Sequence, residues 1–87
     1  MRFWARLFKE NRMTEDAVIT VEGDDTRTHK VFEAIEKISY DLDICRPIWL
    51  DSNINDFRRY SKVRFYKDSF IEAVPFDYME FSVLDED

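Results

Sequence analysis

The residues best suited to nucleophilic catalysis are the only histidine, His29, and the only cysteine, Cys45. Such catalysis needs a base beside the nucleophile, and nothing in the sequence brings these two together. His29 falls in the first turn of an expected helix, where the helix dipole disfavours the charged imidazolium. Asp24 and Asp25 lie near it but supply no second catalytic feature. We therefore expect no catalytic residues, and we interpret His29 as a solvated or partly packed side chain.

Two patterns come close to a metal site, and both fall short. Asp25 and His29, four residues apart, offer two ligands, whereas a stable zinc site usually has three or four. In DSNINDF (51–57) oxygen-bearing side chains alternate as in a calcium loop, but Asp56 and Lys62 replace the required glycine and glutamate. A chain with one glycine also has no Gly-rich phosphate loop. The sequence predicts no metal site and no cofactor.

A basic stretch, RRYSKVRFYK (58–67), is the candidate binding surface. It holds five of the chain's 13 basic residues and none of its 19 acidic ones. Its rings and cations are those that strand-borne platforms use to hold single-stranded nucleic acid. Alternatively, it is a solvated strand face whose cations pair with acids such as Glu80 on another strand. We favour the second interpretation because the surrounding negative charge repels a polyanion. The candidate residues are Arg58, Arg59, Tyr60, Lys62, Arg64, Tyr66 and Lys67.

The clearest element is a long amphipathic helix at about 26–43. Val31, Ile35, Ile38 and Leu42 recur at helical spacing. Capping oxygens at 24–26 precede the helix, Glu33 and Lys37 are spaced to pair on its outer face, and Pro47 prevents its continuation.

Strand patterns lie on both sides of this helix, at 17–21 before it and at 62–67 and 78–84 after it. In the middle pattern, Val63 and Phe65 are expected to face the core. Lys62, Arg64 and Tyr66 are then expected to face outward.

Residues 2–9 fit either a helix or a strand. A helix would align Phe3, Trp4, Leu7 and Phe8, whereas a strand would leave both faces mixed. We expect a strand because 17–21 needs a sheet neighbour and consecutive strands usually pair.

Two further segments connect these elements. NRMTED (11–16) is expected to form a polar connection between the first two strands. SNINDFRRY (52–60) is expected to form a short helix capped by Ser52 or Asn53. The order strands, helix, strands predicts an α+β fold with a mainly antiparallel sheet and the long helix packed on one face.

Length and composition narrow the class of protein. At 87 residues the chain is expected to be one domain (1–87), because two would each be too small for a stable core. A single cysteine excludes an intramolecular disulfide. No uncharged run approaches the roughly 20 residues of a membrane span, and the basic, ring-rich segment 2–9 is too short to hold a membrane surface alone. With a net charge of −6, we expect an acidic, cytoplasmic protein.

Four segments carry a resemblance to a known family. They are DDTRTHKVFEAIEKISYDLD, PIWLDSNI, RFYKDSFIE and FDYMEF, in this order, and the match extends over most of the chain. The chain resembles a family of small uncharacterised proteins from Gram-positive bacteria. The resemblance implies a bacterial, cytosolic, freestanding single-domain protein, and it brings no activity, cofactor or catalytic residue.

The functional expectation is a non-enzymatic module that binds a protein partner or associates with itself. Abundant aromatic residues (16%) and the absence of a catalytic set favour it. The alternative is a single-stranded nucleic-acid binder that uses the basic stretch at 58–67. A membrane partner is not expected.

Overall fold

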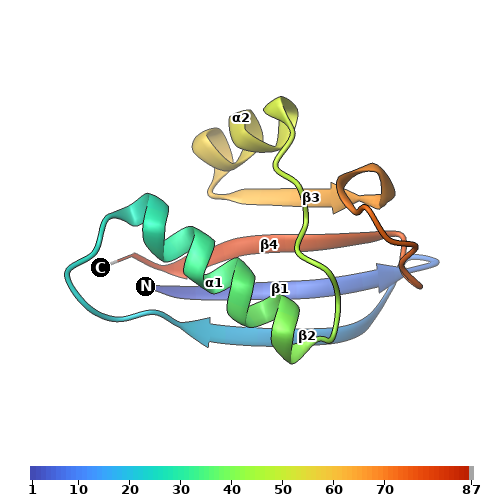
Figure 1. Cartoon of the computed structure of the whole chain (residues 1–87), viewed down its shortest axis with the longest axis horizontal. Coiled ribbons are helices and arrows are strands. Elements are labelled where there is room, and N and C mark those ends of the chain that lie inside the picture. The colour runs from blue at the N-terminus through green and yellow to red at the C-terminus, as the bar shows by residue number, and fades with distance from the viewer. Residues whose placement is uncertain (87) are drawn as a thin grey trace.

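The computed structural model describes residues 1–86, which form one four-stranded antiparallel sheet and two α-helices (Figure 1). The strand order is β2-β1-β4-β3, so the first and last strands lie together at the centre. The α+β class and the antiparallel sheet are thereby confirmed. The elements are β1 (Arg2–Lys9), β2 (Arg12–Thr20), α1 (Arg27–Asp41), α2 (Asp51–Tyr60), β3 (Lys62–Tyr66), a short 3₁₀ helix (Lys67–Ser69) and β4 (Tyr78–Asp85).

The N-terminal segment is a strand, as expected, and it forms a tight hairpin with β2. Glu10 and Asn11 have φ of 52° and 64°, the left-handed pair that a two-residue type I′ turn requires. Lys9 therefore pairs directly with Arg12. The prediction of a polar connection over 11–16 was wrong, because so short a turn lets pairing begin at once. The polar residues of β2 are tolerated because this strand lies at the sheet edge and is mostly exposed.

Helix α1 starts where the capping pattern predicted. The Thr26 hydroxyl accepts a hydrogen bond from the backbone N–H of His29 at 3.2 Å, which satisfies one donor of the first turn. The predicted pair of Glu33 and Lys37 is present on the outer face at 3.5 Å.

The end of α1 comes earlier than the expected residue 43, so the helix is shorter than predicted. The N–H of Asp43 donates to the Tyr40 carbonyl (3.2 Å), and the N–H of Ile44 donates to that of Ser39 (2.9 Å). Asp43 has a φ of 55°. These two bonds and the left-handed residue form a Schellman motif, which satisfies the last carbonyls and stops the helix before Pro47.

A second helix, α2, means that the expected order of strands, helix, strands was only partly right. The predicted short helix at 52–60 exists, but its cap lies two residues before Ser52, the earlier of the two expected caps. Leu50 is the N-cap, and its backbone N–H donates to Oδ1 of Asn53 at 3.0 Å. Asn53 is buried, and its Nδ2 donates to the Arg64 carbonyl at 3.2 Å, so one side chain both caps α2 and fixes it to β3.

The core lies between one face of the sheet and the helices. Along β1 the residues Phe3, Ala5 and Leu7 alternate inward, as do Val63 and Phe65 along β3, as predicted. The rings pack closely: Phe3 and Phe81 stack at 5.3 Å, and Phe57 of α2 stacks on Phe81 at 5.6 Å. Figure 1 shows α1 crossing the strands and α2 beside β3.

Candidate functional site: the helix-free face of the sheet

The opposite face of the sheet carries no helix in the part of the chain that the structure describes (Figure 1). Residues that alternate with the core positions point to this side, and cross-strand partners share it. We call it the helix-free face. Its residues are Trp4, Arg6 and Phe8 of β1, Asp16 and Val18 of β2, Lys62, Arg64 and Tyr66 of β3, and Tyr78, Glu80 and Ser82 of β4.

The basic stretch 58–67 does not form one surface. Lys62, Arg64 and Tyr66 lie on the helix-free face, as expected for alternating strand residues. Residues 58–60 form the last turn of α2, and Ser61, with a φ of 54°, turns the chain from that helix into β3. Lys67 begins the 3₁₀ helix. The structure therefore brings together three of the seven candidate residues.

The centre of the helix-free face is Glu80, whose carboxylate bonds two arginines. Arg64 Nε donates to one oxygen at 3.1 Å, and Arg6 donates to the other. Burial acts to raise the pKa of Glu80, but hydrogen bonds from Arg64 and then Arg6 outweigh it and lower the pKa. Glu80 is consequently ionised at neutral pH, and it bonds both guanidinium groups while offsetting one of their two positive charges. The predicted pairing of the basic stretch with Glu80 is confirmed for Arg64.

Aromatic rings and guanidinium groups alternate across this face. The guanidinium of Arg6 lies 4.2 Å from the Trp4 ring centre, and Phe8 stacks on Tyr78 at 5.0 Å. Tyr78 in turn contacts Tyr66 at 5.5 Å. Each contact crosses or follows the strands, so the rings form a continuous series over β1, β4 and β3. Such contacts hold the side chains in defined positions before any partner arrives.

Sequence reasoning missed most of this series, namely Trp4, Arg6, Phe8 and Tyr78. The strand pattern of residues 2–9 puts the first three on one face, and that signal was present in the sequence. The sequence did not show that these residues lie beside Tyr78 and Glu80. That placement depends on the pairing of β1 with β4, and these strands are far apart in the chain.

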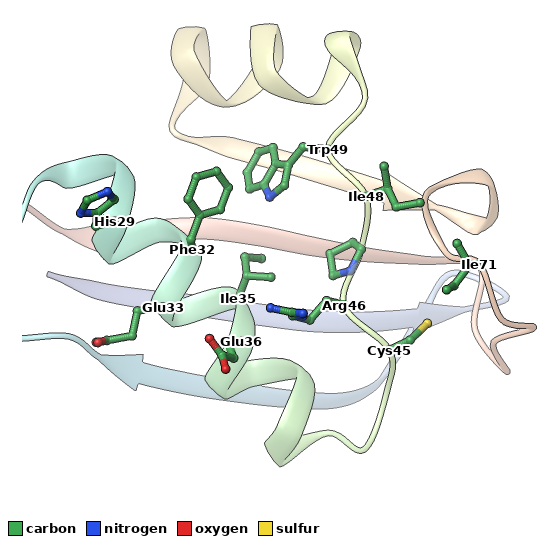
Figure 2. A pocket seen from close by; sticks show the side chains of 11 residues that line it. His29, Phe32, Glu33, Ile35, Glu36, Cys45, Arg46, Ile48, Trp49 and Ile71 are labelled. Carbon is green, nitrogen blue, oxygen red and sulfur yellow. The ribbon is translucent and has the colours of Figure 1, made fainter.

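A groove between α1 and the segment at 45–49 is the second notable surface (Figure 2). It has a volume of about 730 Å³, and Trp49 lies at its side with a buried Nε1 that meets no acceptor among the described residues. Phe32, Ile48 and Ile71 around it are exposed. The lining mixes these apolar side chains with ionisable ones, namely His29, Glu33, Glu36 and Arg46.

This groove brings no catalytic pair together. Figure 2 places His29 and Cys45 at opposite ends of it. Nδ1 of His29 is hydrogen-bonded to Asp25 at 2.9 Å, and bonds from His29 and from the Thr26 backbone lower the pKa of Asp25. Among residues 1–86 no group of three or more His, Cys, Asp or Glu side chains is arranged to hold a metal ion.

Within the same residues, neither helix has the length and apolar character to cross a bilayer.

Comparison with family models, curated proteins and solved structures found no match. The resemblance to small proteins of Gram-positive bacteria stays a prediction from the sequence.

Proposed function

We propose that this chain is a non-enzymatic protein-interaction module of the bacterial cytoplasm, and that a protein partner binds the helix-free face. The observation that carries the proposal is the preorganised series of rings and paired arginines on a sheet face that no described helix covers. Tryptophan, tyrosine and arginine dominate the binding energy of protein interfaces, because they bury large areas with few mobile torsions.

The charge of this face favours a protein over a polyanion. Glu80 offsets one of the two positive charges of Arg6 and Arg64 and occupies a donor of each, so this pair of arginines has less charge and fewer donors to offer phosphates. The chain as a whole carries −6, which repels nucleic acid at longer range.

The partner should present apolar side chains with carboxylates to one side of them. The rings around Glu80 provide an apolar contact on this face. Lys62 at its edge, and Arg58 and Arg59 on the adjoining turn of α2, form no ion pair within the described chain. Unpaired cations on one side of the rings fix the orientation of the opposite charge on a partner.

A second candidate function is binding of single-stranded nucleic acid on the same face. The observation in its favour is the series Phe8, Tyr78 and Tyr66, because successive rings on a sheet can stack successive bases. This candidate requires Lys62 and the α2 arginines to contact phosphates.

Site-specific photo-crosslinking separates the two candidates. A photoreactive phenylalanine replaces Tyr66 on the face, and the control carries the same residue at Glu72, an exposed position beside residues 43–45. We expect a discrete protein adduct from position 66 in cells, absent from position 72 and reduced by Lys62→Glu, which reverses the rim charge and leaves the hydrogen bonds of Glu80 in place.

The other outcomes are equally distinct. A nuclease-sensitive adduct at position 66 would establish the nucleic-acid candidate instead. An adduct with twice the mass of the chain would identify a second copy as the occupant. Equal adducts at positions 66 and 72, or none at 66, would refute docking at this face.

A further inference from the structure

The outer edge of β2 presents backbone groups that the sheet does not use. Met1 and Val21 exchange two backbone hydrogen bonds, at 3.0 and 2.9 Å, so they form a hydrogen-bonded pair of the antiparallel ladder. Hydrogen-bonded and non-hydrogen-bonded pairs alternate. With the observed register, Thr20, Val18 and Asp16 fall in the non-hydrogen-bonded pairs with β1, and their N–H and C=O groups point away from the sheet.

The opposite edge of the sheet is shorter and is partly occupied by α2. There Asn53 of α2 donates to the Arg64 carbonyl at 3.2 Å, and β3 is only five residues long. β2 has nine residues and is largely exposed. A long unpaired edge is the template for adding a strand from another chain, and β2 is the edge of this sheet with that property.

A groove lies beside this edge, between β2 and α1. It has a volume of about 580 Å³ and is lined by Ile19 of β2 and by Glu33, Glu36, Lys37, Tyr40 and Asp41 of α1. Figure 2 shows Glu33 and Glu36 extending from α1 on the side of β2. Because Lys37 pairs with Glu33, the lining keeps an excess of negative charge.

We propose that the β2 edge binds an extended basic segment of a partner protein as a fifth strand. Its backbone would bond Asp16, Val18 and Thr20. Alternate side chains would enter the groove, where lysine or arginine meets Glu36 and Asp41. This site uses the backbone edge of β2 and the groove on the helix side, so it does not depend on what binds the rings of the helix-free face.

A second copy of this chain is a poor occupant of the same edge. If two β2 strands paired, Glu15, which shares the helix side of the sheet with Ala17 and Ile19, would face the acidic groove of its partner. Like charges placed opposite one another disfavour strand pairing, and each copy carries −6.

The test uses synthetic octapeptides and the full chain. In the probe peptide, lysine and valine alternate. One control peptide has four lysines followed by four valines, and in the other glutamate and valine alternate. At saturating probe we expect amide hydrogen exchange at Asp16, Val18 and Thr20 to slow by about tenfold or more. The control peptides should leave these amides unchanged.

A proline substitution supplies the decisive variant. Val18→Pro removes an outward N–H that β1 does not use, and proline is tolerated on edge strands in that orientation. The Val18→Pro variant should still be folded, as shown by a cooperative unfolding transition, but it should no longer bind the probe peptide. Val18→Thr should still bind it. Tyr66→Ala on the helix-free face should also bind it, which separates this site from the proposed function. Equal binding of both lysine peptides, or binding that survives Val18→Pro, would overturn the proposal.

Discussion

Replacing Glu80 with glutamine tests the centre of the helix-free face. The change preserves size but removes the charge that Arg6 and Arg64 share. The side chain of Glu80 is 4% exposed and that of Arg6 is 27% exposed, so their bond is shielded from water. A hydrogen bond to a charged group contributes about 1.5–3 kcal/mol. Arg64 is 51% exposed and can rehydrate, so its share is smaller. We expect Glu80→Gln to lower the free energy of unfolding by about 2–3 kcal/mol at pH 7.

The same substitution predicts a pH dependence. The pKa of Glu80 is lowered in the folded state, so the folded chain binds fewer protons than the unfolded chain near that pKa. The stabilisation is complete above the unfolded pKa, about 4.3 for glutamate, and is lost as pH falls through the folded pKa. Urea unfolding followed by tryptophan fluorescence should therefore show the two proteins converging in stability below about pH 4.

Arg2→Gln is the matched control for this experiment. It breaks the ion pair between Arg2 and Asp85 on the same sheet, in which the two side chains are 51% and 57% exposed. It should change stability by less than about 1 kcal/mol. If Glu80→Gln costs no more than this control, or if its cost is the same at pH 7 and pH 3, the charged centre inferred from the structure is wrong.

Three substitutions test the fold. Asp43→Gly should stabilise the chain by about 0.4–1 kcal/mol, because glycine adopts the left-handed φ at the end of α1 without strain. Thr26→Ala should destabilise it by about 1 kcal/mol, because the N–H of His29 loses its cap. Phe57→Ala should cost about 3–5 kcal/mol, because it opens a cavity beside Phe81. Each change in the free energy of unfolding can be measured by urea unfolding. A change of the opposite sign would contradict the contact or backbone conformation from which it is predicted.

The periodic part of the fold could be read from the sequence, and the ends of its elements could not. Alternation and helical spacing depend on which side chains face the core, and they predicted α1, β3 and β4. The ends depend on the backbone. The left-handed conformations of Glu10, Asn11 and Asp43 set the β1–β2 turn and the end of α1. None of these residues is a glycine, so the usual sequence signal was missing.

The candidate site was half predictable for a different reason. Lys62, Arg64 and Tyr66 share a face because of local alternation, which any strand imposes. Arg6 joins them only because β1 pairs with β4, and this pairing of the first and last strands is a property of the topology.

The topology also changes what the basic stretch means. Along the sequence, Arg58 to Lys67 is a run of cations without an acid. In space Arg64 of this stretch bonds the buried carboxylate of Glu80. Arg6, from the other end of the chain, bonds the same carboxylate. The buried carboxylate offsets one of the two guanidinium charges, and both groups keep planar faces that are fixed against Trp4 and Tyr78. The surface therefore offers shape and ring contacts more than long-range attraction, and those are the properties by which a protein partner is held.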